Sequence, residues 1–312
     1  MVNNTKTIQY SFPDGKIGGT GLVDGAGMYL MKAAAILTSP MDYVGLSWAN
    51  RIVRTFLPSS RDVITSLSED TKFAFPYGDA YWGRLLGNNK GYAPDIEHFL
   101  KAMQHMDYCF IDCGANYGYL SALVTSDEYG NIPTIAIEAD PNTFKVLEQN
   151  AELNQNRFEL LNRAIFSKSG DMVQIHGAKH EARSILSDEG ELLNGNVETL
   201  ALAELVDWVE QQNSDCVILK LDIEGVEIEA MKGLGALKDK DLLILYEDHA
   251  SDPSHEVSQY FLNELGMEVF VSEMDKCRKV QSLEDIAAVK KNSRVGYDFI
   301  ATNSSAWLNE IQ

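Results

Sequence analysis

The first candidate ligand site is a loop that closes an apolar run. Residues 108–113 read YCFIDC, a mixture of apolar, aromatic and β-branched types that predicts a buried strand. Gly114, Asn116 and Gly118 follow directly behind Asp112. Glycines let the backbone approach a ligand closely, and the helix expected next offers free N–H groups. A dinucleotide loop of the form G-x-G-x-x-G would have glycine where Asn116 stands, and Asp112 suits a cationic ammonium better than a pyrophosphate.

A second acid ends the next predicted strand, in the run TIAIEAD. Glu138 lies 20 residues after Gly118, the interval at which an acid commonly holds both hydroxyls of a ribose. A ligand with a ribose and an α-amino acid end fits Asp112 and Glu138 together, and S-adenosylmethionine is such a ligand. We predict that Asp112 faces its ammonium through water and that Glu138 holds its ribose. The other predicted cofactor contacts are Gly114, Ala115, Asn116, Gly118, Tyr119 and Ala139, with Asn162, Arg163 and Ala164 beside the adenine.

Four residues after two later strands are candidates for the chemistry. Asp222 and Glu224 flank the end of the predicted strand 217–222, and Glu247 and His249 lie at the end of the strand predicted at 241–247. Either Asp222 or His249 could take a proton from an acceptor hydroxyl, because carboxylates and imidazoles both act as general bases. We predict no metal site, although Asp222, Glu247 and Asp248 could gather as oxygen ligands of a divalent cation.

Strands alternate with helical patterns from residue 108 onward. This alternation predicts an α/β fold with a mostly parallel sheet covered on both faces, and the last strand could run antiparallel. Ligands of such sheets bind beyond the carboxyl ends of the strands, where all the candidate residues lie. The predicted strands are 108–113, 133–138, 157–162, 217–222, 241–247, 268–271 and 297–301, and the predicted helices are 117–126, 142–154, 201–211, 226–233 and 254–265.

The first hundred residues read differently. The glycine-rich stretch GGTGLVDGAG, residues 18–27, lacks the G-K-[ST] ending of a phosphate loop and predicts a flexible or tightly turned segment. Helical spacing follows at 28–37 and 41–57, where Val44, Trp48, Ile52 and Phe56 define one apolar face. Residues 62–75 predict two short strands joined by a polar turn, and 95–104 a helix.

Composition limits the classes of partner. The chain of 312 residues has 46 acidic against 26 basic residues, a formal net charge of −20, which repels nucleic acid and anionic lipid. The N-terminal MVNNTKTIQY lacks the basic and apolar regions of a secretory signal, and no apolar run is long enough to span a bilayer. We expect a cytoplasmic protein with no membrane span, with four cysteines as free thiols and with a homo-oligomer left open.

The chain resembles the FkbM-type methyltransferases. The matching segments run in family order across about 108–301, and the K-x-D-x-E-G-x-E block from Lys220 to Glu227 is the most specific of them. The family commonly has isoleucine where Tyr117 stands, and residues 1–60 show no such resemblance. The matching segments are FIDCGANYGYLSAL, IAIEADPNTFKVLEQNAELN, LLNRAIFSKSGD, VETLALAEL, ILKLDIEGVEIEAMKG, LLILYEDH and YDFIAT.

The resemblance implies a Rossmann-like, seven-stranded methyltransferase sheet with an N-terminal helical and β-hairpin extension. It also implies S-adenosylmethionine as the methyl donor and a hydroxyl, on a small-molecule or carbohydrate acceptor, as the group methylated. We divide the chain into the extension at 1–105, with acceptor or oligomer contacts, a methyltransferase domain at 106–303 and a tail at 304–312. Two alternatives stay open: a nicotinamide-dependent oxidoreductase on a Rossmann fold, and a non-catalytic module that binds S-adenosylmethionine.

Overall fold

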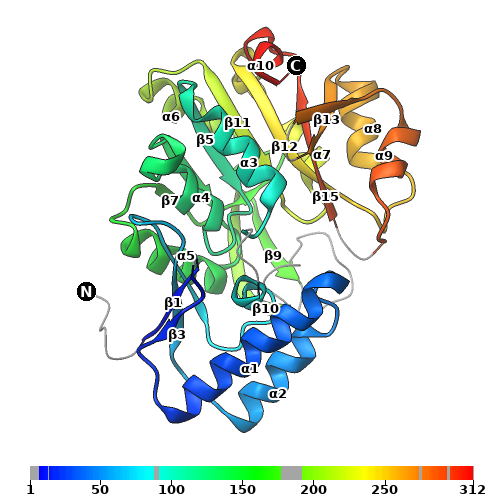
Figure 1. The fold of residues 1–312 in the computed structure, drawn as a ribbon. Coiled ribbons are helices and arrows are strands. Elements are labelled where there is room, and N and C mark those ends of the chain that lie inside the picture. Colours follow the sequence, from blue (N-terminus) through cyan, green and yellow to red (C-terminus); the bar gives the residue numbers. More distant parts are fainter. Residues whose placement is uncertain are drawn as a thin grey trace.

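A computed structural model describes residues 7–12, 14–87, 91–176, 192–273, 276–293 and 296–311. In this part of the chain, eight strands form a central sheet in the order β14-β13-β15-β12-β11-β5-β6-β7 (Figure 1). Their bounds are β5 (Tyr108–Cys113), β6 (Thr134–Ile137), β7 (Glu159–Leu161), β11 (Cys216–Leu221), β12 (Asp241–His249), β13 (Glu268–Glu273), β14 (Lys276–Val280) and β15 (Gly296–Thr302).

The sheet contains all seven predicted strands and one more. Strands β7, β6, β5, β11 and β12 are parallel, and the last strand, β15, lies between β12 and β13 and is antiparallel to both, as expected. The predicted count of seven was wrong because β14 also joins, antiparallel to β13. Its sequence KCRKV has three cations, which are typical of an edge strand and weaken an apolar strand signal.

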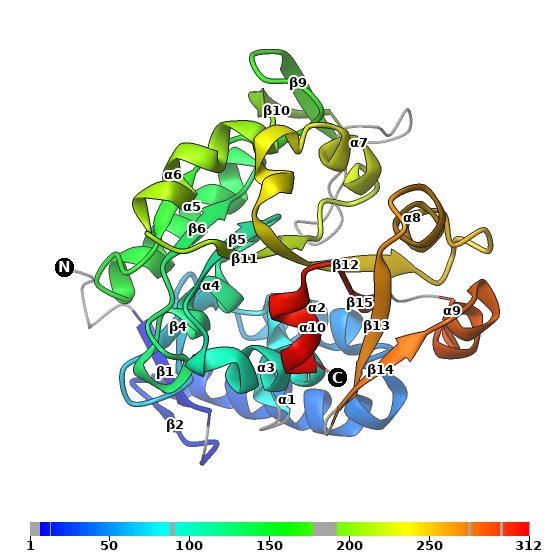
Figure 2. The same ribbon diagram turned by 90° about the horizontal axis from the view of Figure 1, so that it is seen from above.

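Both faces of the sheet are covered (Figure 2). Strand β5 is buried at every position, so apolar side chains are needed on both sides of it. One core cluster contains apolar residues of α3 (Pro94–Ala102), α4 (Tyr119–Val124) and α10 (Ser305–Ile311), and a second contains those of α6 (Val206–Gln211) and α7 (Glu227–Lys232). Residues 304–312, expected to form a tail, thus contain a helix whose Trp307 is fully buried.

Three further helices complete this half of the molecule. Helix α5 (Pro141–Leu153) begins as its sequence predicts, because the Asp140 side chain accepts hydrogen bonds from the backbone N–H groups of Asn142 and Thr143. Helices α8 (Glu256–Gln259) and α9 (Leu283–Val289) pack together beside the edge of the sheet, and a π-helical turn (Tyr260–Glu264) continues α8. A small sheet of β8 (Ala164–Ile165), β10 (Leu192–Leu200) and β9 (Met172–His176) was not predicted.

The extension contains a sheet of its own, in the order β2-β1-β3-β4. The predicted hairpin is confirmed as β3 (Asp62–Ser66) and β4 (Lys72–Pro76), and β1 (Thr7–Ser11) and β2 (Ile17–Gly18) extend it. The extension docks through Asn150 of α5. The Asn150 side chain exchanges hydrogen bonds with the backbone of Ala74 in β4 and donates one to the carbonyl of Tyr117 in the loop after β5.

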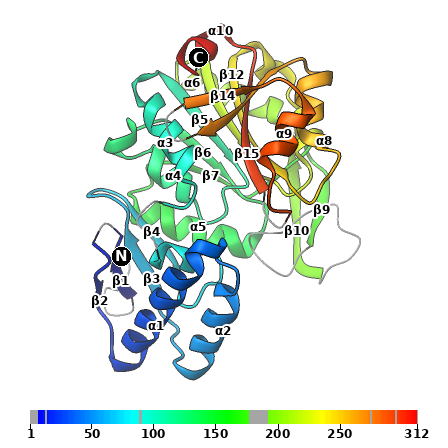
Figure 3. The same cartoon turned by 45° about the vertical axis from the view of Figure 1, so that its right-hand side comes forward.

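Two antiparallel helices, α1 (Leu22–Thr38) and α2 (Leu46–Phe56), lie below the carboxyl ends of the parallel strands (Figure 3). Helix α1 starts at Leu22, so the prediction of a flexible or turned segment up to residue 27 was wrong for its second half. Gly27 lies inside the helix because Tyr77 packs where a side chain would be. A 3-10 turn (Ser39–Met41) follows α1. Among the described residues, none of the helices combines the length and the apolar character that a membrane span requires.

The predicted apolar face of the second helix points away from the core. Val44, Trp48, Ile52 and Phe56 are all exposed, while Leu46 and Val53 are buried on the opposite side of α2. An amphipathic pattern shows which residues share a face, but it does not show which face the protein covers.

Candidate active site

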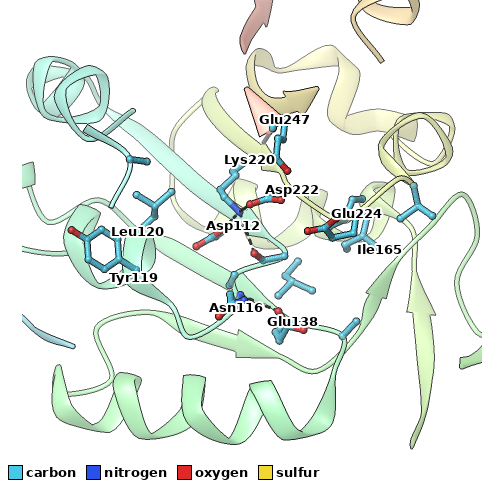
Figure 4. A pocket seen from close by; sticks show the side chains of 18 of the residues that line it. Asp112, Asn116, Tyr119, Leu120, Glu138, Ile165, Lys220, Asp222, Glu224 and Glu247 are labelled. Atoms are coloured by element: carbon cyan, nitrogen blue, oxygen red, sulfur yellow. Dashed lines mark hydrogen bonds and ion pairs between the residues drawn. The ribbon is translucent and has the colours of Figure 1, made fainter. Parts of the chain in front are cut away.

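A pocket of about 500 Å³ lies at the carboxyl ends of β5, β6, β11 and β12 (Figure 4). This is the edge where the strand order reverses, since β5 has β6 on one side and β11 on the other. The volume suits a ligand the size of a cofactor or drug molecule. The extension closes one wall with the short 3-10 helix η2 (Trp82–Leu86) and the residues around Tyr92.

The loop after β5 fits tightly against the loop after β11. Gly114 has a φ of +75°, and a Cβ atom there would overlap the carbonyl oxygen of Asp222. Glycine is therefore required both by the backbone conformation and by the close approach of the two loops. This contact places Asp112 and Asp222 around one cavity.

Lys220 in β11 joins these two acids. Its Nζ atom lies 3.3 Å from Oδ1 of Asp112 and 3.4 Å from Oδ2 of Asp222, and it donates a 3.1 Å hydrogen bond to the carbonyl of Gly114. Burial alone would lower the pKa of Lys220, but the Asp222 and Asp112 carboxylates outweigh it and raise the pKa. The ammonium therefore stays charged, and Asp112, which also accepts a 2.7 Å bond from Ser121, already has a cation beside it.

Glu138 forms the opposite end of the pocket. Its Oε2 atom accepts a 2.9 Å hydrogen bond from the backbone N–H of Asn116, and Oε1 accepts a 2.8 Å bond from that of Asp140. Each carboxylate oxygen can accept a second hydrogen bond, so one further donor can approach each of them. Burial raises the pKa of Glu138 to about 7, which shows that the carboxylate lacks full compensation for its lost hydration.

A second cluster, of Glu224, Glu247 and His249, lines the same pocket. The Nε2 atom of His249 is 3.2 Å from Oε2 of Glu247 and 3.5 Å from Oε2 of Glu224. Hydrogen bonds to Glu224 and Glu247 raise the pKa of His249 to about 11, so the imidazolium is the stable form at neutral pH. Burial and the nearby charge of Asp222 raise the pKa of Glu247. Facing ligand atoms of Glu224, Glu247 and His249 all lie within 4.8 Å of one another.

Strand alternation separates Asp248 from this cluster. Side chains of a strand point to opposite faces in turn, so Glu247 and His249 line the pocket and Asp248 does not. Asp248 is buried on the other side, where its Oδ1 atom is 2.7 Å from Nζ of Lys290. The three side chains of Asp222, Glu247 and Asp248 therefore cannot bind one cation together, because Asp248 lies on the other face of the sheet.

Most of the predicted site residues line the pocket. Gly118 and Asn162 do not: Gly118 packs against Leu147, and the Asn162 side chain donates hydrogen bonds to the carbonyls of Glu138 and Ala139. Asn162 thus holds the backbone that presents Glu138. The predicted residues that line the pocket are Asp112, Gly114, Ala115, Asn116, Tyr119, Glu138, Ala139, Arg163, Ala164, Asp222, Glu224, Glu247 and His249.

Acceptor contacts were expected from the extension, but sequence reasoning did not identify the residues of the wall that it supplies. Tyr81, Trp82 and Tyr92 pack as an aromatic cluster, and the Arg84 guanidinium lies 3.9 Å from the centre of the Tyr81 ring. Trp82 also donates a 3.3 Å hydrogen bond from Nε1 to Oδ1 of Asn116, which ties this wall to the loop after β5. The composition YWGRLL offered a signal, since aromatic residues with an arginine are common in binding surfaces.

Two further missed residues belong to the central strands. Lys220 lies inside the most specific sequence block but was not singled out. Asp298 of β15 lines the pocket beside Glu247, because the antiparallel register pairs these two residues. Burial and the charge of Asp222 raise the pKa of Asp298 to about 7.

The strand order, the reversed strand β15 and a pocket at the carboxyl ends of the parallel strands define the fold class: the sheet is of the Rossmann-like type found in methyltransferases. The family profile described as "Methyltransferase FkbM domain" matches residues 112–269, half of the chain. The chain therefore belongs to the FkbM methyltransferase family.

Solved structures with a similar fold include three from different organisms. An FkbM methyltransferase from Methylobacillus flagellatus is 13% identical with a TM-score of 0.39, and the match covers 62% of this chain but only 43% of that one. An O-methyltransferase from Thermotoga maritima is 14% identical (TM-score 0.34, 81% of each chain). TYW2 from Pyrococcus horikoshii, in complex with MeSAdo, is 16% identical (TM-score 0.36, 82% of this chain and 81% of that one). No curated protein matches the chain in sequence.

Proposed function

We propose that the protein transfers a methyl group from S-adenosylmethionine to a hydroxyl oxygen of a small-molecule or carbohydrate acceptor. The observation that carries this proposal is the pairing of Glu138, whose two oxygens each keep an acceptor site, with an acidic cluster at the other end of one pocket. A ribose fits the first end, and a hydroxyl that must lose a proton fits the second.

The residues of the pocket fit the donor. Glu138 is placed to accept hydrogen bonds from the two ribose hydroxyls, and Asp112 lies between that end and the acidic cluster, where an ammonium would bind. Lys220 offsets part of the charge of Asp112, so contact with the ammonium through water suits this site better than a second direct ion pair. When bound, S-adenosylmethionine supplies a methyl group on a cationic sulfur, which is open to attack by an oxygen.

The acceptor end has the groups that deprotonation of a hydroxyl needs. Asp222 lies at the end of β11, facing the cavity between Lys220 and Glu247 (Figure 4). We assign the proton-accepting role to Asp222, with Glu247 next to it. His249 holds positive charge between Glu224 and Glu247 and therefore orients these carboxylates rather than taking the proton.

The aromatic wall supports an acceptor with a flat or ring-shaped face. Tyr81, Trp82 and Tyr92 line the same pocket as the carboxylates, from the extension. Aromatic rings pack against apolar ring faces, and carboxylates accept hydrogen bonds from hydroxyls, so a sugar ring or a phenol meets both requirements.

Isothermal titration with S-adenosylhomocysteine and with NAD tests the donor. We expect binding of S-adenosylhomocysteine and none of NAD, and the reverse result would restore the oxidoreductase alternative. Methyl transfer is then followed with isotopically labelled donor against a panel of sugars, phenols and amines. Label found on nitrogen, with none on oxygen, would contradict the hydroxyl assignment.

A further inference from the structure

The exposed apolar side chains of the protein are concentrated on one surface. Apart from Met172 and Leu265, every large apolar side chain that is exposed in the described part of the chain lies within residues 22–56, on the hairpin of α1 and α2. We call the outward surface of these two helices the hairpin face. Such a concentration of exposed apolar side chains on one hairpin points to an interaction site, because incidental exposure would be spread over the molecule.

Helix α1 is apolar on its outward side as well as on its inward side. Leu22, Leu30 and Leu37 recur at helical spacing and are exposed, whereas Met28 and Met31 are buried in the core. The two charged residues of α1 do not make its outward side polar. Asp24 is buried and lies 2.5 Å from Arg61, and Lys32 donates a hydrogen bond to the carbonyl of Gly15. A helix at a water-facing surface normally presents charged residues outward, and the exposed positions of α1 carry none.

Helix α2 adds the features of an interfacial helix. Its exposed side carries Trp48 and Phe56, and the exposed Arg51 and Arg54 lie on the flank of this apolar stripe. Residues 22–57 contain three basic and two acidic residues, in a chain whose net charge is −20. The acidic surplus therefore lies elsewhere, and the repulsion of lipid expected from the whole chain does not apply locally to this surface.

Two kinds of partner could cover the hairpin face: a second copy of the chain or a lipid surface. In a two-fold pair the same patch meets itself, so the arginines of both copies would gather around one apolar contact. The exposed acid of this segment, Asp42, already accepts a hydrogen bond from Asn292. Lipid headgroups instead place phosphate oxygens at the border of an apolar layer, which matches an apolar stripe flanked by arginines.

We propose that the hairpin face binds a phospholipid membrane surface, with α1 and α2 lying in the plane of the interface. Leu30, Leu37 and Trp48 would enter the boundary between headgroups and acyl chains, and Arg51 and Arg54 would contact the phosphates. Apolar burial drives this binding, so it requires no anionic lipid. The proposal does not depend on methyl transfer.

This arrangement places the pocket near the membrane. Tyr43, in the connection between α1 and α2, lies with its ring 5.7 Å from the guanidinium of Arg84, which lines the pocket. Asp42 is joined to Asn292, close in sequence to the pocket residues Gly296 and Asp298. The turn of the hairpin therefore adjoins the rim of the active site.

Tryptophan fluorescence gives a direct test. Trp48 is 71% exposed, while Trp82, Trp208 and Trp307 are all buried, so a change in emission on adding vesicles reports on the hairpin face. We expect a blue shift and quenching by brominated lipid with phosphatidylcholine vesicles, with a similar response when phosphatidylglycerol is included. The protein should co-sediment with both kinds of vesicle, and salt should have little effect.

A matched pair of variants locates the surface. Leu30→Glu combined with Leu37→Glu should lower the lipid partition coefficient by about tenfold or more, because two buried leucines are lost to water. Met172→Glu, at an exposed apolar position far from the hairpin in sequence, should bind vesicles as the unmodified protein does. Both variants should keep their circular dichroism spectrum, since all three side chains are exposed.

Two results would overturn the proposal. One is the absence of both the emission shift and co-sedimentation with either kind of vesicle. The other is a dimer in analytical ultracentrifugation that becomes a monomer in the double variant, with no vesicle binding by the unmodified protein, which would assign the hairpin face to a second copy of the chain.

Discussion

The proposed recognition of a ribose by Glu138 predicts a specific dependence of ligand affinity on pH. Burial raises the pKa of Glu138 to about 7, so the group is half ionised at that pH. Ribose hydroxyls donate hydrogen bonds to the ionised carboxylate and therefore lower its pKa in the complex. The affinity is nearly complete at about pH 8 and falls as the pH falls through 7, because the carboxyl group must first lose a proton.

The magnitude follows from the ionised fraction. With a pKa of about 7, roughly nine-tenths of the free protein is ionised at pH 8 and roughly one-tenth at pH 6. The dissociation constant should thus be about tenfold higher at pH 6 than at pH 8, or ~1.4 kcal/mol. Glu138→Gln keeps the shape and one acceptor oxygen but removes the charge, and each lost charge-assisted hydrogen bond is worth about 1.5–3 kcal/mol. The variant should bind about tenfold or more weakly at pH 8.

The ligand for this assay is 5′-methylthioadenosine, which keeps the ribose but has no amino acid group of its own that could change charge over this pH range. Isothermal titration at several pH values should give curves for the two proteins that converge toward pH 6, where Glu138 is itself mostly protonated. Parallel curves, or a dissociation constant that does not change with pH in the unmodified protein, would refute the role of Glu138. Thermal unfolding checks that the variant keeps the loop, since the backbone of Asn116 and Asp140 depends on this side chain.

Three further predictions concern the rest of the pocket. Asp222→Asn should lower turnover by about 10²–10⁴ and change the affinity for S-adenosylhomocysteine by less than about tenfold. His249→Gln should keep more activity, and the opposite ranking in a kinetic assay would move the proton acceptor to His249. EDTA should leave turnover unchanged, because protonated His249 already lies between the carboxylates of Glu224 and Glu247. Activity that is lost with EDTA and restored by Mg²⁺ would show a cation requirement. Gly114→Ala should lower the free energy of unfolding by more than about 4 kcal/mol in denaturant titrations, against about 1–2 kcal/mol for the control Gly170→Ala. Both glycines have a positive φ, but only at Gly114 would the added Cβ atom overlap backbone atoms. Equal losses in the two variants would contradict this reasoning.

The cofactor end of the pocket is predictable because it is built from strand ends. Parallel strands bring their carboxyl termini to one edge, so acids after β5, β6, β11 and β12 must converge whatever the loops do. Asp112, Glu138 and Asp222 all line the pocket for this reason. Asn162 follows a strand as well, but its amide turns back to bond the backbone of residues 138 and 139. Position at a strand end locates a residue without fixing the direction of its side chain.

The other wall of the pocket depends on contacts that no local pattern reveals. Tyr81 and Trp82 reach the site because Asn150 and Asn116, far away in sequence, bond to the extension and hold it in place. Asp298 faces Glu247 only through the register of β15 on β12, and a shift by one residue would turn it to the other face. Docking between segments and strand register are properties of the folded chain, so they could not be read from residue types.

Strand β12 shows how alternation sorts charges that look equivalent in the sequence. Glu247, Asp248 and His249 are three titratable neighbours, yet only the outer two line the pocket. The middle one, Asp248, would be an uncompensated buried charge without Lys290, whose Nζ atom lies 2.7 Å away and is equally buried. On the pocket face, Asp222 and Glu247 are only partly buried and are offset by Lys220 and His249, which leaves the cluster with more carboxylates than cations. One face of β12 thus carries a neutralised structural pair, and the other keeps the unbalanced negative charge that a proton, removed from an acceptor hydroxyl, would relieve.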